Sequence, residues 1–158
     1  LMEMQHMNPE SRLWFYGLDS PMSVLQTKEL SALMSEFVNE WKAHGSELAA
    51  AFRLFSNQFL IITVDENQQT ATGCSIDKSV HLLQEFGMKH NLDFFNRLLV
   101  HIEHGDAHDT YSISQLKEAI ANGEVHPLSN ILNTTATTLR ESGTGKIALK
   151  DSWAAKYL

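Results

Sequence analysis

The residues of this chain best suited to chemistry lie in segment 72–80, Thr-Gly-Cys-Ser-Ile-Asp-Lys-Ser-Val. It holds the only cysteine, Cys74, with Gly73 before it, Ser75 after it and Asp77 three residues further on. An apolar run precedes the segment and an amphipathic run follows it, so we expect a strand, a turn of small residues and a helix N-terminus. Backbone N–H groups at such a terminus bind anions or stabilise a thiolate.

The first function that fits this segment is a non-catalytic binding domain. In it Gly73, Ser75 and Asp77, together with Arg12, would hold a small anion or a partner protein. A purely structural interpretation is also open. Ser75 would then be the N-cap of the following helix, and Asp77 would lie in its first turn, where the helix dipole favours a negative charge.

The alternative function is a thiol-dependent enzyme. Cys74 would be its nucleophile, His44 the base that activates the thiol, and Asp65 the group that orients the imidazole. Here too a structural interpretation remains: Cys74 is a small buried residue under the helix, and His44 interacts with the carbonyl groups at a helix end. A single cysteine excludes dithiol redox chemistry.

We expect no metal and no cofactor. Four candidate ligands, His101, His104, Asp106 and His108, lie close together in the sequence. Their spacing fits no zinc signature, and in a strand His101 and His104 would point to opposite faces.

The hydrophobic pattern predicts the elements that must position these residues. Residues 12–17 are aromatic and end at a glycine, which indicates a strand. Apolar residues from Leu30 to Trp41 have helical spacing, and His44-Gly45 resembles the end of that helix. The remaining predicted elements are a hairpin of residues 48–55 and 58–64 around Ser56-Asn57, a helix from Ser75 to about His90, and a strand at residues 97–103, closed by residues 104–106.

The resulting order over residues 12–104 is β-α-β-β-α-β, the ferredoxin-like split βαβ pattern of an antiparallel sheet in an α+β protein. Another α+β sandwich with the same elements in a different order is the alternative. In the ferredoxin-like arrangement Arg97 lies at one end of the sheet. The residues expected to gather at the other end are Arg12, His44, Asp65, Glu66, Cys74, Ser75, Asp77 and His104.

Residues 105–158 are predicted to form a partly helical C-terminal extension of a single domain, 1–158. Ser112 to Gln115 resembles a capping box before a short helix that ends near Asn122-Gly123. Residues 127–139 suggest another helix, and residues 141–146 a loop.

Composition narrows the choice of partners and compartment. The 158 residues carry a formal net charge of −7 without a Lys/Arg cluster, so we expect no nucleic acid. Apolar runs are too short to span a membrane, and the first residues lack the basic region of a secretory signal. The lone cysteine is compatible with a cytoplasmic protein. A homodimer through an open sheet face remains possible.

Several segments together resemble one bacterial family of short proteins. They are Ser11-Arg12-Leu13-Trp14-Phe15-Tyr16, Phe37 with Trp41, His44 and Gly45, Asp65-Glu66, residues 71–80 and Asp151-Ser152-Trp153. The family is uncharacterised, and its members often carry the label "ABC transporter ATPase". The Gly-Cys-Ser-Ile-Asp piece is the specific part of the likeness. The resemblance implies no activity.

The ATPase label fails on physical grounds. A P-loop needs Gly-x-x-x-x-Gly-Lys-Ser/Thr after a strand, because its backbone N–H groups wrap the phosphates and its hydroxyl holds Mg²⁺. The nearest segment is residues 143–147. Before it, Arg140 stands at the position of the first glycine of the motif, and Ile147 stands at the position of the Ser/Thr hydroxyl. We therefore expect no nucleotide hydrolysis.

Overall fold

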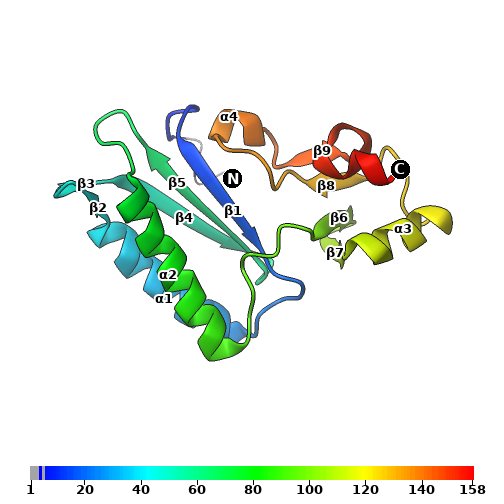
Figure 1. The fold of residues 1–158 in the computed structure, drawn as a ribbon, viewed down its shortest axis with the longest axis horizontal. Helices are drawn as coiled ribbons and strands as arrows, with labels where there is room; N and C mark the ends of the chain where they lie inside the picture. Colours follow the sequence, from blue (N-terminus) through cyan, green and yellow to red (C-terminus); the bar gives the residue numbers. More distant parts are fainter. Residues whose placement is uncertain (1–3, 5) are drawn as a thin grey trace.

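The computed structural model describes residue 4 and residues 6–158, and it is a mixed α+β structure (Figure 1). Its elements are β1 (Arg12–Gly17), α1 (Val24–Glu40), β2 (Lys42–Ala43), β3 (Ser46–Glu47), β4 (Ala49–Phe55), β5 (Phe59–Asp65), α2 (Gly73–His90), β6 (Val100–His104), β7 (Ala107–Tyr111), α3 (Ile113–Ala121), β8 (Asn130–Leu132), α4 (Leu139–Ser142) and β9 (Lys146–Ala148), followed by the 3-10 helices Leu149–Asp151 and Trp153–Tyr157. The strands form three antiparallel sheets, ordered β1-β5-β4, β2-β3 and β7-β6-β8-β9.

The ferredoxin-like order is not confirmed. Three of the four expected strands form one sheet, in the order β1-β5-β4, but β6 belongs to a different sheet. The outer edge of β1, where the fourth strand would pair, has other partners. The guanidinium of Arg97 donates to the carbonyl of Phe15, and the backbone N–H of Leu13 donates to Thr137 O over 2.8 Å. These contacts provide partners for backbone groups that a missing strand would leave unpaired.

The sheet β1-β5-β4 is buried on both faces. Helices α1 and α2 cover one face (Figure 1), where Trp14, Tyr16 and Ile62 join a core that includes Leu30 and Leu83. The other face carries Leu13, Phe15, Phe59 and Ile61, which pack with Leu132 and Leu139 from the C-terminal half. The central strand β5 is consequently buried from Phe59 to Val64. The open sheet face considered above for a homodimer is contacted here by residues of the C-terminal half.

Helix α1 ends earlier than the sequence predicts. It stops at Glu40, because Trp41 takes an extended backbone (φ −69°, ψ 124°) and its side chain is buried in the core. His44 and Gly45, expected to end the helix, instead form the turn of the small β2-β3 hairpin. Both have positive φ, 51° and 77°, in the left-handed region that favours glycine.

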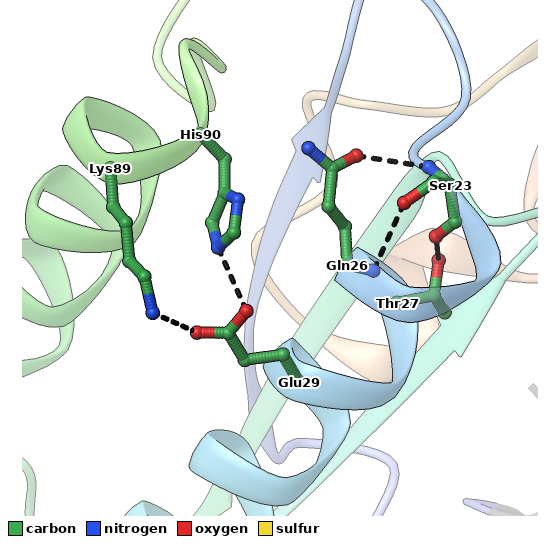
Figure 2. A network of polar contacts seen from close by, with 6 residues as sticks. All are labelled: Ser23, Gln26, Thr27, Glu29, Lys89 and His90. Carbon is green, nitrogen blue, oxygen red and sulfur yellow. Dashed lines mark hydrogen bonds and ion pairs between the residues drawn. The ribbon is translucent and has the colours of Figure 1, made fainter.

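An ion-pair network joins the start of α1 to the end of α2 (Figure 2). Glu29 accepts from Lys89 Nζ at 2.5 Å, and its other oxygen lies 2.9 Å from His90 Nε2. The hydrogen bond from Lys89 is the largest cause of the lowered pKa of Glu29. A capping box between Ser23 and Gln26 starts α1 on the adjoining turn. The ion pairs connect α1 to α2, and the capping box sets where α1 begins.

The C-terminal half differs most from expectation. The capping box of Ser112 and Gln115 starts α3 as predicted, and that helix ends at Ala121. Residues 127–139 form no helix over most of their length: they contain the strand β8, and α4 begins only at Leu139. The predicted strand 97–103 begins at Val100, and its turn at residues 104–106 leads into β7, which pairs with it along its full length.

Candidate functional site

The predicted site at the start of α2 is organised by Thr72 rather than by Ser75. Thr72 is the N-cap, and its hydroxyl accepts from the Ser75 N–H at 3.2 Å. The Ser75 hydroxyl accepts from Thr72 N at 2.7 Å and donates to Thr72 O at 2.8 Å, and it is buried. The prediction of Ser75 as N-cap was therefore wrong by three residues. Its hydroxyl is occupied in the capping box and is not free for a ligand.

Gly73, Cys74 and Asp77 all face solvent. Gly73 and Cys74 are the first two residues of the helix, and the Cys74 thiol is exposed, so its interpretation as a small buried residue is wrong. Asp77 lies in the second turn rather than the first, because the helix starts earlier than expected.

Arg12 and the start of α2 lie at one end of the sheet and are joined through two tryptophans. The Arg12 guanidinium lies 4.9 Å from the centre of the Trp14 ring, and the Trp14 and Trp41 ring centres are 6.2 Å apart. The Trp41 indole N–H then donates to Ser75 O over 2.8 Å. The strands agree with this placement, since Arg12 pairs with Val64 beside Asp65. The indole rings occupy the space between Arg12 and Ser75.

The catalytic set proposed from the sequence shows no direct contacts. His44 is exposed in its hairpin turn, and Asp65 Oδ1 accepts from Asn67 N at 3.1 Å in the loop after β5. In residues 6–158 no hydrogen bond or ion pair joins His44, Asp65 and Cys74. His104 is placed by the other sheet, where its Nδ1 lies 2.6 Å from Asp109 Oδ2.

A cavity of about 210 Å³ lies between the sheet face that α1 and α2 leave free and the C-terminal half. Its apolar walls come from both sheets, and a few polar groups reach into it. The lining residues are Leu13, Phe15, Arg53, Phe55, Ile61, His108, Leu132, Asn133, Ser142, Thr144, Gly145 and Lys146. A mostly apolar concavity with few polar groups is the usual form of a small-molecule site.

His108 is the unusual polar group of this cavity. Both its ring nitrogens are buried and have no hydrogen-bond partner within the described part of the chain. Its ring lies edge-on to Phe59, with centres 5.4 Å apart. Burial lowers the pKa of His108, Glu103 opposes this, and Lys146 adds to it. Buried polar groups without partners are rare in folded proteins, so this imidazole is a candidate for contact with a ligand.

A second histidine, His101, lies at the contact between the two sheets, edge-on to Phe59 of β5. Its Nδ1 lies 2.9 Å from Thr110 Oγ1, which accepts from Gln58 Nε2 at 2.8 Å. Burial, followed by the charge of His108, lowers the pKa of His101 to about 4.

Gly17 makes room for this histidine. A Cβ on residue 17 would lie 2.5 Å from His101 Nε2, too close for any real contact. The imidazole therefore packs against bare backbone at the end of β1 and stays neutral at ordinary pH. Its role is structural, at the junction of two sheets.

Sequence reasoning missed the cavity. It considered His101 and His108 only as metal ligands, and the described residues contain no group of three or more His, Cys, Asp or Glu side chains able to hold a metal ion. One signal was present: Arg53 is the only charged residue in the apolar run Ala-Ala-Ala-Phe-Arg-Leu-Phe of β4. A single charge on a strand of this kind marks a polar position on a buried face.

Within the described ranges, no helix combines the length and apolar character needed to cross a membrane. Comparison of the chain with known protein families, with curated proteins and with solved structures found no match.

Proposed function

We propose that this protein is a non-catalytic binding domain whose ligand is a small, largely apolar molecule held in the cavity between the two sheets. One observation carries the proposal. A space of about 210 Å³ is walled by apolar side chains and contains the buried, unpartnered ring nitrogens of His108. A ligand in this space would remove apolar surface from water and could give His108 a partner.

Binding is favoured over catalysis because the cavity lacks a paired nucleophile and base. His108 is the titratable base among its lining residues, yet neither ring nitrogen is hydrogen-bonded to a hydroxyl. The Ser142 hydroxyl donates to Leu139 O at 2.7 Å instead. Nucleophilic catalysis needs hydrogen-bond contact between the two groups.

Filling the cavity is the direct test of this proposal. We expect toluene, a neutral apolar probe, to shift the methyl NMR resonances of Leu13, Ile61 and Leu132 in the unchanged protein. Leu132→Trp places an indole in the space and should abolish the shifts at the other two residues, because the probe no longer fits. Leu132→Phe fills less of it and should weaken binding less.

Leu128→Trp is the matched control, because Leu128 is 64% exposed and does not line the cavity. It should leave the shifts unchanged. If toluene shifts none of the three residues in the unchanged protein, or shifts Leu13 and Ile61 by the same amount in folded Leu132→Trp, the cavity is not the binding site.

The edge formed by residues 44, 65 and 73–77 is the second candidate, for a small anion, a partner protein or a thiol-dependent reaction. The exposed Cys74 thiol at the second residue of an 18-residue helix favours it. Against it, the Ser75 hydroxyl and the Asp65 carboxylate already make hydrogen bonds within the local chain.

Alkylation of Cys74 separates the two functions. We expect iodoacetamide to modify the folded protein at neutral pH within about threefold of the rate for a free cysteine, because the thiol is exposed and has no base in contact. The rate should be the same in His44→Gln and in the control His81→Gln, another exposed histidine. An acceleration of more than about tenfold that His44→Gln alone removes would instead show a thiol activated by His44 and favour the thiol-dependent enzyme.

We also propose a fold pattern, a ligand class and a cellular compartment from the sequence. The ferredoxin-like pattern describes the arrangement of β1, α1, β4, β5 and α2 without a fourth strand. The acidic composition supports a ligand other than nucleic acid, and a single cysteine fits the cytoplasm.

A further inference from the structure

The cavity carries positive charge in a protein that is acidic overall. Its lining includes Arg53 and Lys146, and none of the described lining residues is an aspartate or a glutamate. The formal net charge of the whole chain is −7. Two cations on the wall of a mostly apolar space favour a ligand that combines a negative charge with an apolar body.

Arg53 is the cation with donors to spare. Lys146 is ion-paired with Glu103, and that hydrogen bond is the largest cause of the lowered pKa of Glu103. Arg53 makes no ion pair in the described part of the chain, and its guanidinium lies 5.2 Å from the centre of the Phe55 ring. A guanidinium offers parallel N–H groups that match the two oxygens of a carboxylate.

His108 is the second group available to an anion. Charged and titratable groups surround it on several elements: Glu103 lies opposite it in the β6-β7 ladder, Lys146 is on β9, Arg53 on β4 and His101 on β6. Burial and Lys146 favour the neutral imidazole, and Glu103 opposes them. A carboxylate beside the ring would favour the protonated form, in which both nitrogens are donors.

The cavity is large enough for a single ring or a short branched chain. Its volume is about 210 Å³, and a cavity of roughly 150 Å³ in another protein admits benzene. The apolar walls contributed by Leu13, Phe15 and Ile61 suit the body of such a molecule.

We propose, resting on the binding function above, that the ligand is a small aromatic or branched aliphatic carboxylate, which Arg53 holds and to which His108 donates a hydrogen bond after taking up a proton from solvent. No covalent step is involved. The binding equilibrium therefore couples binding of the carboxylate to proton uptake by His108, and binding strengthens as the pH falls through the range in which His108 titrates.

Benzoate and benzamide test the charge, because they share the ring and differ in the acidic group. At about pH 6 we expect benzoate to bind at least about tenfold more tightly than benzamide in methyl NMR titrations. Arg53→Met should remove most of this preference and leave benzamide binding unchanged, and Arg53→Lys should keep part of it. Lys28→Met, which removes an exposed charge on α1, is the control and should change nothing.

The His108 ring itself reports the proton. We expect saturating benzoate to raise the pKa read from the His108 Cε1–Hε1 resonance by about one unit, while benzamide leaves it unchanged. Benzoate should accordingly bind about three- to fivefold more weakly at pH 8 than at pH 6, and His108→Gln should flatten this dependence.

Three outcomes would overturn the inference, and they differ from failure of the cavity itself. Equal affinity for benzoate and benzamide would exclude the carboxylate. Toluene binding without benzoate binding would do the same, and both results would leave an apolar site standing. A His108 pKa that does not respond to bound benzoate would exclude proton uptake. Failure of the proposed function appears separately, as the absence of any toluene response.

Discussion

Replacing Phe59 by alanine is expected to lower the free energy of unfolding by about 3–5 kcal/mol, the usual cost of removing a large aromatic side chain from a core. Phe59 is fully buried on the central strand β5. Its ring centre lies 5.9 Å from that of Phe15 and 5.0 Å from that of Phe55. It also meets the rings of His101 and His108 edge-on, at 4.8 Å and 5.4 Å. One deletion therefore removes the contact surface of four rings.

Urea denaturation measures this loss, and two further variants make it interpretable. Phe59→Leu keeps most of the side-chain volume, so its loss of unfolding free energy should be well under half of the loss in Phe59→Ala. This variant remains informative if Phe59→Ala does not fold. Phe95→Ala is the control: Phe95 is only partly buried and packs against Tyr16 on the helix-covered side. If Phe59→Ala costs no more than Phe95→Ala, the buried cluster on the face of the sheet toward the C-terminal half does not contribute to stability as its burial indicates.

The second large effect is a loss of stability in acid caused by His101. The pKa of this imidazole is lowered from 6.5 to about 4 in the folded protein. Above about pH 6.5 the group is neutral in both states and has no effect. As the pH falls toward 4, the unfolded chain binds a proton that the folded protein excludes. The free energy of unfolding should therefore fall by about 3 kcal/mol across this window.

Comparison with a variant isolates this contribution from the carboxylates that also titrate in acid. His101→Gln keeps a polar group near Thr110 but cannot be protonated, so its stability should decline less steeply between about pH 6.5 and pH 4. His81→Gln removes an exposed histidine and should follow the unchanged protein. Parallel curves for His101→Gln and the unchanged protein would show that His101 is protonated equally in both states.

Local chemistry predicted much of the first half of this fold. The strand at residues 12–17 has the same bounds in the structure, and Ser56 and Asn57 form the hairpin turn with φ of 55° and 52°. The capping box at Ser112 also starts a helix where expected. In each case the residues that decide the conformation are neighbours in the sequence, so their types are sufficient evidence.

The second sheet could not be predicted in this way. Strands β8 and β9 have three residues each, which is too short to show a two-residue period. β8 is a strand because it pairs with β6 at Ile102 and with β9. Those partners lie far away in the sequence, and nothing within residues 127–139 indicates them. The expected helix there was a local interpretation of a segment whose structure is set by distant contacts.

Distant contacts also explain why the candidate site lies in the cavity and not at the predicted edge. The predicted edge relied on elements that do form, and Arg12, Asp65 and the start of α2 do lie at one end of the sheet. The cavity instead requires two sheets to face each other. Arg53 and His108 meet there only because β4 and β7 belong to different sheets. A prediction that contained only one sheet could not bring these two residues together.

Several residues that contact β1 are synthesised long after it, and this affects the chain while it is still on the ribosome. The outer edge of β1 and the apolar face beside it are completed by residues 97 and 132–139. At typical translation speeds about 4–15 s separate the end of β5 from residue 139. Throughout that interval the nascent polypeptide presents Leu13, Phe15 and Ile61 to solvent beside the unpaired outer edge of β1. Such a surface is a substrate for chaperones that bind extended apolar segments during translation.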